Sequence, residues 1–345
     1  MIKFIIIFYF YFIIKSIKIP KVSIIIPSYN IPKYEYLEKS INSILNQSFK
    51  NFELIVVDDN ANDQTPKILD KYAFNDKRVI IIHKTKNELT GYSRNTGMDF
   101  VMGEYLGFLD YDDIFHIDAI KFAYFEAKKK NYTIVNFKYK SFKNESSILN
   151  YLQNRKKNYK IKILNANYNF PIKKTGIHVW RNIYKSSFIF SHNFKFYNTW
   201  SDEDVLFCLT VFSFEYEILL INKPLVFHRL LKTSVGHNNK KKKIRQKFIL
   251  IYLRNIFKIF KQNNLINNRI RNNIFVLLTI SHFKKNIEKL LRFFKSYKEI
   301  FGDNIVRNFY INIFKMKKIE KLYFYKENNI NKYEIIIKNK INCFI

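Results

Sequence analysis

Residues 103–113 read GEYLGFLDYDD, an apolar segment that stops abruptly at three carboxylates. The apolar part has the length of a buried strand, and acids at the carboxyl end of such a strand lie where open α/β sheets bind ligands. Asp110 and Asp112 can direct two hard oxygen donors toward one divalent cation, Mg²⁺ or Mn²⁺, beside a diphosphate. Alternatively, Asp112 and Asp113 only cap a helix that begins near Ile117.

The residues around this segment alternate between strand-like and helix-like pieces. Runs of apolar residues predict strands at 22–26, 52–57, 79–82 and 106–109. Helical spacing and start signals predict helices at 36–47, 65–72, 92–101 and 117–130. This alternation predicts an α/β fold, with a Rossmann-like, mostly parallel sheet flanked by helices.

The regular alternation weakens after residue 135. Lys and Asn are frequent over residues 138–169, which predicts an insertion or a mobile connection. A second structured block is expected over residues 176–237. It should contain, in order, an amphipathic helix through Phe214, a strand at 218–221 and a loop that carries His228 and Arg229.

The charge of the chain is uneven. The formal net charge is +32, and residues 241–345 carry 25 Lys and Arg against 6 Asp and Glu. We expect this basic, mainly helical C-terminal appendage to favour an anionic partner such as a membrane surface, although composition alone can produce solvated Lys faces. No zinc-ligand spacing or nucleic-acid module is recognisable, so no nucleic-acid partner is expected.

The first 20 residues form a hydrophobic segment. Residues 4–14 are an unbroken apolar run, which is too short to span a bilayer alone but suits a membrane anchor or the apolar part of a signal peptide. A third reading is an extra strand or helix packed on the domain that follows. Membrane association is therefore favoured, with a cytoplasmic location as the alternative, and the two cysteines leave the compartment undecided.

Six blocks with characteristic residues follow one another along the chain. They are VSIIIPSYN at 22–30, VVDDNANDQT at 56–65, RNTG at 94–97, GEYLGFLDYDD at 103–113, WRNIYK at 180–185 and EDV at 203–205. Together they resemble the successive blocks of a family 2 glycosyltransferase.

The resemblance covers about residues 21–237 and implies a GT-A fold at 21–240. Residues 21–137 would form the nucleotide-sugar half and residues 170–240 the acceptor half. The resemblance also implies a nucleoside-diphosphate sugar as donor, with a UDP-sugar expected, a divalent metal, and inversion at the sugar carbon.

Several residues of the first half have side chains suited to a nucleotide. Pro27 and Tyr29 place a rigid turn and an aromatic ring where a nucleobase or ribose would lie. Asp59 can accept a hydrogen bond from a base N–H, with Asp58 in support, although an Asp-Asn turn is the simpler reading. Arg94 is expected to open a helix, where its planar donor fork suits a diphosphate or uracil.

The resemblance sharpens the reading of the three carboxylates. It makes Asp112 the direct metal ligand and directs Asp110 toward the ribose or a metal-bound water, which leaves Asp113 to cap the helix. In related enzymes a loop at the position of His228 and Arg229 closes over the diphosphate. His228 could therefore complete the metal shell and Arg229 could contact phosphate.

The acceptor half supplies the remaining candidates. Asp204, beside Glu203 in the first turn of a predicted helix, is the expected base that takes a proton from the acceptor hydroxyl. These acids could instead only complement the helix dipole. Trp180 and Trp200 are candidate surfaces for stacking on a sugar, although a single Trp more often belongs to the core.

The function expected from these features is metal-dependent, inverting transfer of a hexose or N-acetylhexosamine to a glycan or lipid-linked acceptor. One alternative is a catalytically inactive protein that keeps the fold and binds a glycan or nucleotide. Another is a sugar nucleotidyltransferase, which fits less well because no Gly-rich triphosphate loop stands near Pro27.

Overall fold

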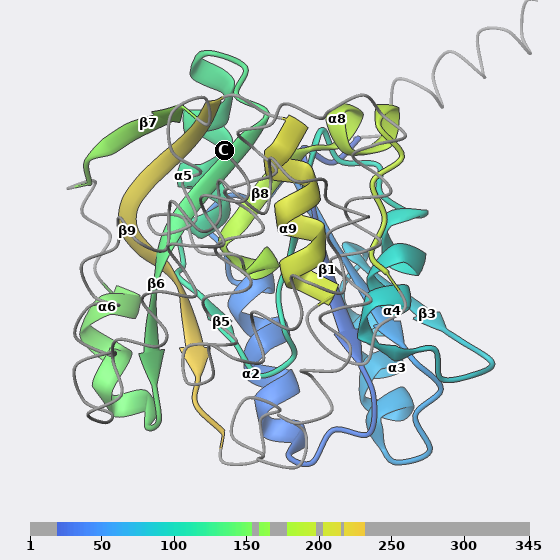
Figure 1. Cartoon of the computed structure of the whole chain (residues 1–345). Helices are drawn as coiled ribbons and strands as arrows, with labels where there is room; N and C mark the ends of the chain where they lie inside the picture. The colour runs from blue at the N-terminus through green and yellow to red at the C-terminus, as the bar shows by residue number, and fades with distance from the viewer. Residues whose placement is uncertain (1–18, 154–158, 166–177, 198–202, 215–216, 232–345) are drawn as a thin grey trace, which may run out of the picture. The chain divides into compact units, whose positions relative to one another are not determined.

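The computed structural model describes residues 19–153, 159–165, 178–197, 203–214 and 217–231, which are coloured in Figure 1. All of them belong to the first of two compact units, Met1–Lys242. The predicted N-terminal segment up to residue 18, Trp200, and the basic C-terminal region lie outside the described residues. Within the described ranges, no helix has both the length and the apolar character needed to cross a bilayer.

A single mixed sheet forms the centre of the described part. Its strand order is β3-β2-β1-β4-β8-β6-β9-β5, and β7 also pairs with β9. Figure 1 shows this order from β3 on the right to β9 and β7 on the left. The first four strands are parallel, as the alternating pattern predicts: β1 (Val22–Ser28), β2 (Phe52–Asp58), β3 (Val79–His83) and β4 (Tyr105–Phe108).

Helices lie between these strands and close to their predicted positions. They are α2 (Tyr34–Leu45), α3 (Thr65–Asn75), α4 (Leu89–Met98) and α5 (Ala119–Lys129). Every residue of β1, β2 and β4 is buried, because helices cover both faces of a parallel sheet. This explains why these strands read as continuous apolar runs.

Two predicted helix starts need correction. Helix α4 begins at Leu89, three residues before the predicted start, so Arg94 lies in the middle of the helix and does not open it. Helix α5 follows Asp118, so the expectation that Asp113 caps it is wrong. Asp113 is fully buried and has a different partner, described below.

The second half of the sheet contains strands that the sequence only partly predicts. They are β5 (Ile114–Phe115), β6 (Ile134–Phe142), β7 (Ile161–Asn165), β8 (Asn182–Lys185) and β9 (Glu217–Arg229). Shorter elements are η1 (Glu145–Ile148), α6 (Leu149–Gln153), η2 (Val179–Arg181), α8 (Ser186–Ser191) and α9 (Glu203–Phe214). The prediction of an insertion over 138–169 is therefore wrong at both β6 and β7.

Strand β9 also corrects the expected loop at residues 228 and 229. His228 and Arg229 are the last two residues of this 13-residue strand. The polar Asn222 and Lys223 and the following Pro224 interrupt its apolar pattern and conceal its length. The pairing of β6 with β9 shifts register near Lys138, opposite Pro224, and such an irregularity lets a strand accommodate a proline.

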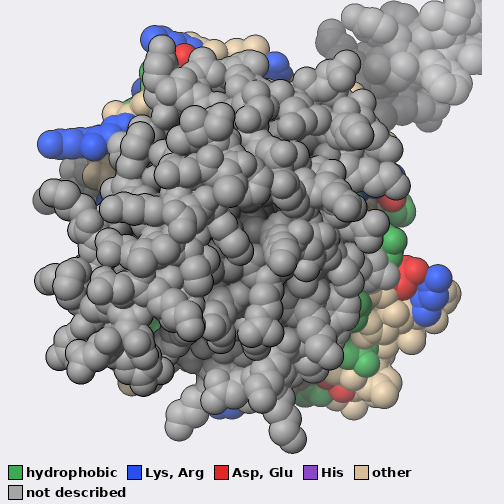
Figure 2. Space-filling model, in the orientation of Figure 1, with side chains coloured by type: hydrophobic (Ala, Val, Ile, Leu, Met, Phe, Trp, Pro, Cys, Tyr) green, Lys and Arg blue, Asp and Glu red, His purple; other side chains and the backbone are tan. Residues whose placement is uncertain are grey.

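Exposed charges on the described surface are partly paired. Figure 2 shows Lys and Arg side chains at separate points around the visible rim, some beside Asp or Glu. Lys128 lies 2.6 Å from Glu104, and Arg78 lies 2.6 Å from Asp76. Pairs at the surface, whether exposed or partly exposed, contribute little to stability, so the fold depends on its apolar sheet.

Gly97 allows α4 to pack directly on the sheet. A Cβ atom at this position would lie 2.6 Å from Cγ2 of Ile25 on β1. We predict that Gly97→Ala lowers the free energy of unfolding by up to about 2 kcal/mol, because an overpacking cost of about 1–3 kcal/mol exceeds the gain of about 1 kcal/mol in helix propensity. Urea denaturation measures this change.

The exposed Thr90 on the same helix provides the control. Thr90→Ala should leave stability unchanged or raise it slightly, because Ala is the better helix former and no packing is disturbed. A stabilising effect of Gly97→Ala would contradict the close approach of α4 to β1.

Candidate functional site

The candidate site lies where parallel strands end. Ser28 at the end of β1 pairs with Asp58 at the end of β2, and Asp110 follows two residues after β4. The chain turns sharply after β1 and β2, at Asn30 and Asn60, which have φ angles of 40° and 64°. Asn tolerates this left-handed conformation, so both loops can turn back over the edge of the sheet.

The two acids after β2 are buried and fix the neighbouring loop. Asp58 lies 2.8 Å from Nδ1 of His83. Asp59 accepts hydrogen bonds from Nζ of Lys84 at 2.6 Å and from the amide of Glu88 at 3.0 Å. These contacts hold the chain that leads into α4, and the nucleobase contact expected of Asp59 stays a prediction.

Two residues near the end of β1 occupy the same edge. Pro27 is buried in the strand, and Tyr29 directly follows it with 45% of its surface exposed. A half-exposed ring at a strand end offers a face on which a flat base can stack. Of the two residues, only Tyr29 is exposed at this edge, and the nucleoside contact expected of Pro27 and Tyr29 stays a prediction.

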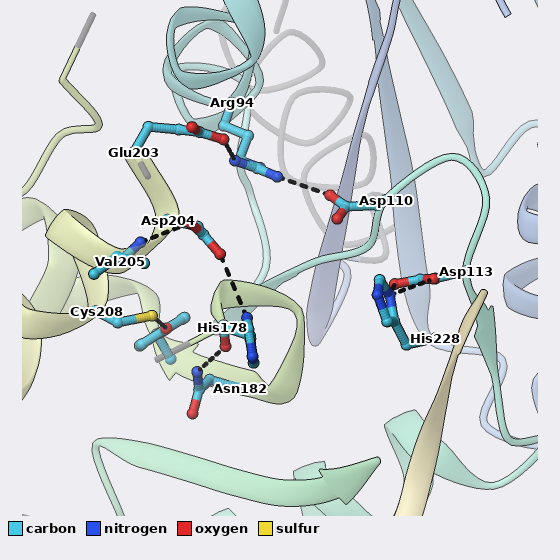
Figure 3. Close-up of polar contacts among 11 residues, drawn as sticks. Arg94, Asp110, Asp113, His178, Asn182, Glu203, Asp204, Val205, Cys208 and His228 are labelled. Carbon is cyan, nitrogen blue, oxygen red and sulfur yellow. Dashed lines mark hydrogen bonds and ion pairs between the residues drawn. The ribbon is translucent and has the colours of Figure 1, made fainter. Parts of the chain in front are cut away.

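Arg94 connects the two halves of the site. Its Nη2 donates to Oδ1 of Asp110 at 2.7 Å, and its Nη1 donates to Oε1 of Glu203 at 2.8 Å (Figure 3). The side chain is 3% exposed, and its guanidinium carbon lies 5.3 Å from the ring centre of Phe196. Burial lowers the pKa of Arg94, but the two acids outweigh it and raise the pKa, so the guanidinium stays charged.

Gly91 brings α4 close to α9. A Cβ atom at Gly91 would lie 2.7 Å from the carbonyl oxygen of Tyr197 and 3.3 Å from Cβ of Glu203. No larger residue fits this approach without a shift of the backbone. Gly91 therefore lets Arg94, one turn further along α4, reach Glu203, and sequence reasoning did not assign it that role.

The acidic loop after β4 is fixed to the end of β9. Asp113 accepts hydrogen bonds from Nδ1 of His228 at 3.0 Å and from the amide of Arg229 at 2.9 Å. Arg229 in turn donates through Nε to the carbonyl oxygen of Asp112 at 3.0 Å, and through Nη2 to Glu145 at 3.0 Å. Asp113 and Arg229 thus hold the loop that carries the predicted metal ligands.

Negative charge is concentrated in this loop. Burial and the neighbouring Asp113 and Asp110 raise the pKa of Asp112 to about 8. Burial lowers the pKa of His228, but its hydrogen bond to Asp113 and the nearby acids outweigh this and raise it to about 9. Among the described residues, no group of three or more His, Cys, Asp or Glu side chains is arranged to hold a metal ion.

The acceptor-side acids begin α9, as predicted. Burial raises the pKa of Asp204, but His178, Arg94 and the amide of Val205 together hold it below its ordinary value. Burial raises the pKa of Glu203 against the opposing effect of Arg94. Neighbouring acids whose pKa values diverge take different roles, and of these two only Asp204 has a pKa below its ordinary value.

Three flat side chains form a column beside these acids. Trp180 stacks on His178 with ring centres 4.7 Å apart, and on His228 with ring centres 5.0 Å apart. Trp180 is 4% exposed and both of its faces are covered, so the hypothesis that it stacks on a sugar is wrong. Sequence reasoning also missed His178, whose position two residues before Trp180 was the available signal.

Residues 23–190 match the model of the family described as Glycosyl transferase family 2. Glycosyltransferase GlyG of Streptococcus pneumoniae is 32% identical over 114 residues, which are 33% of this chain and 37% of that protein. The putative teichuronic acid biosynthesis glycosyltransferase TuaG of Bacillus subtilis is 36% identical over 102 residues, which are 30% of this chain and 40% of that protein. The chain thus spans less than half the length of these relatives.

A solved structure has a similar fold. Residues 1–349 of Staphylococcus aureus TarS, in complex with UDP-GlcNAc, match with a TM-score of 0.61 and 19% identity, over 84% of this chain and 80% of that one. The predicted GT-A-like α/β fold is therefore confirmed for the described part.

The bridge formed by Arg94 should carry much of the stability of the site. We predict that Arg94→Met lowers the free energy of unfolding by about 3–5 kcal/mol, because Asp110 and Glu203 lose the charge that they share. Arg94→Lys should lose less, since it keeps the charge but not the fork that reaches two carboxylates. Urea denaturation at neutral pH measures both variants.

Lys128 provides a control, because it pairs with Glu104 at the surface. Lys128→Met should have only a small effect on the unfolding midpoint. If Arg94→Met and Lys128→Met lowered the free energy of unfolding equally, the prediction that the Arg94 bridge stabilises the site more than a surface pair does would be wrong.

Proposed function

Because residues 23–190 form a family 2 glycosyltransferase domain, we propose that the chain transfers a sugar from a nucleoside-diphosphate sugar to an acceptor hydroxyl, with inversion at the sugar carbon. One observation carries the proposal: Arg94 lies within hydrogen-bond distance of both Asp110 and Glu203. The donor-side acids and the acceptor-side acids therefore belong to one site, as transfer between two bound substrates requires.

Asp204 acts as the base in this reaction. The acceptor oxygen attacks the anomeric carbon, its proton passes to a carboxylate oxygen of Asp204, and the bond from that carbon to the diphosphate breaks. The lowered pKa of Asp204 keeps the carboxylate ionised and ready to accept the proton. Glu203, bound to Arg94, positions the guanidinium and the start of α9.

The acidic loop suits a divalent metal. Asp110 and Asp112 supply hard oxygen donors, and the raised pKa of Asp112 reflects negative charge that a cation would offset. His228, whose Nδ1 is bonded to Asp113, could present Nε2 to the metal once the cation displaces the proton from that nitrogen. Bound Mg²⁺ or Mn²⁺ would supply positive charge beside the departing diphosphate.

The nucleotide is placed at the ends of β1 and β2. Tyr29 offers a ring face to the base, with Pro27 two residues before it in β1, and Asp59 offers an acceptor to a base N–H, with Asp58 in support. We infer that the donor is a UDP-sugar carrying a hexose or N-acetylhexosamine. The TarS structure, which contains UDP-GlcNAc, supports this choice through the shared fold.

Two further roles complete the proposal. Arg229 holds the acidic loop through the carbonyl oxygen of Asp112, and its charge lies near enough to that loop to favour a diphosphate there. The acceptor is a glycan or a lipid-linked sugar. The name of TuaG, a putative teichuronic acid biosynthesis enzyme, supports an acceptor of this class.

A donor screen tests the function. The purified full chain should hydrolyse or transfer from at least one UDP- or GDP-sugar in the presence of Mn²⁺. We predict that Asp204→Asn lowers kcat by about 10²–10⁴-fold, the usual contribution of a positioned base. Asp112→Asn should raise the Mn²⁺ concentration that gives half-maximal activity, because one of the proposed ligands is lost.

Asp99→Asn is the matched control, since Asp99 is an exposed acid just beyond α4. Its activity should equal that of the unmodified chain. If no nucleotide sugar binds or turns over with metal present, the transferase proposal is wrong. Donor binding without turnover, unchanged by Asp204→Asn, would instead indicate a binding protein that keeps the fold.

A further inference from the structure

We propose that His178 is a positioning residue for Asp204, and that the column of His178, Trp180 and His228 fixes the distance between Asp204 and the acidic loop. This inference rests on the proposed function, because it assigns the column a role in the same transfer reaction. It names His178 as a residue on which the rate of transfer depends although it touches no reacting atom.

Both carboxylate oxygens of Asp204 have a neighbour within the site. Nδ1 of His178 lies 3.8 Å from Oδ2 of Asp204, and Oδ1 of Asp204 accepts a hydrogen bond from the amide of Val205 at 2.8 Å. Figure 3 shows the imidazole pointing at the carboxylate. Each carboxylate oxygen of Asp204 therefore has one neighbour. These two neighbours limit rotation of the Asp204 side chain and so determine which of its lone pairs face the hydroxyl of the acceptor substrate.

His178 is itself held firmly. Its carbonyl oxygen accepts a hydrogen bond from Nδ2 of Asn182 at 3.0 Å, and Asn182 is fully buried. The amide of Arg181 also donates to this carbonyl, at 3.3 Å. The His178 side chain is 40% exposed, but its backbone is fixed and one face of its ring is held against Trp180, so the ring can act as a stop for Asp204.

Trp180 transmits this position to the other end of the column. Its ring planes lie at 9° to His178 and 11° to His228, and Tyr139 packs edge-on against it with ring centres 5.1 Å apart. Contacts on both faces and one edge leave the indole no room to slide, as in other closely packed interiors.

The column ends at the acidic loop. Asp113 accepts a hydrogen bond from Nδ1 of His228 and another from the amide of Arg229. Two carboxylates, Asp204 and Asp113, thus terminate one stack of three rings. Reaction between bound substrates depends strongly on small changes of distance, so a rigid spacer between the base and the loop that holds the donor favours transfer.

Two substitutions separate the duties of the His178 ring. His178→Phe keeps a flat ring on Trp180 but removes the nitrogen that faces Asp204. His178→Asn removes the ring but keeps a polar group close to the position of Nδ1. We expect His178→Phe to lower kcat at least tenfold with the donor KM unchanged, and His178→Asn to recover part of that loss.

His192 provides the matched control. It also stacks on an aromatic ring, that of Phe194 at 5.2 Å and 6°, and it lies at the exposed end of α8. His192→Phe should leave kcat unchanged. If His178→Phe also leaves kcat unchanged, or if it changes only the donor KM, His178 does not position the base and the inference is overturned.

A second measurement needs no substrate and so separates this inference from the proposed function. In urea unfolding, the combined variant His178→Phe with Asp204→Asn should shift the midpoint by less than the sum of the two single shifts. Additive shifts would show that the pair does not interact and would overturn the inference. Coupling without any transfer from nucleotide sugars would overturn the proposed function and leave the contact intact.

Discussion

A single buried guanidinium holds the two halves of this site together. Two partly buried carboxylates from segments more than 90 residues apart, Asp110 and Glu203, lie on either side of one buried cation, which offsets their charges. Arg94 provides this cation with a planar fork that reaches both. The geometry in turn demands that α4 lie close to β1 and to α9, and Gly97 and Gly91 make that approach possible.

The acidic loop presents a different electrostatic problem. Arg94 on α4 is the partner of Asp110, and the end of strand β9 supplies the partners of the rest of the loop: the ring of His228, the amide of Arg229 and the guanidinium of Arg229. The bonds fall mainly on Asp113 and on the backbone of Asp112. The loop that carries the carboxylate of Asp112 is therefore fixed by bonds to the neighbouring groups.

Much of the first half could be predicted from the sequence, because its signals are local. Buried parallel strands read as apolar runs, and the acids after β2 and β4 stand at the edge where the pattern puts them. The second half could not be predicted in the same way, because β6 and β9 pair although they are distant in sequence. Pro224 also interrupts the apolar pattern of β9, so its full length is not evident from the sequence. The roles of Asp113, Gly91 and His178 were missed for a related reason: each depends on a partner from another part of the chain, which no local pattern reveals.

The place of β9 in the sheet also bears on the order in which the chain can mature during synthesis. Among the described strands, β9 lies beside β6 on one side and pairs with β5 and β7 on the other, so neither of those short strands has its partner until β9 emerges from the ribosome. Until then the edge of β6 is open to other strands, a state that favours aggregation. The parallel half of the sheet could form early during synthesis. The site would stay incomplete, because His228 and Arg229, which fix the acidic loop, are among the last described residues to be made.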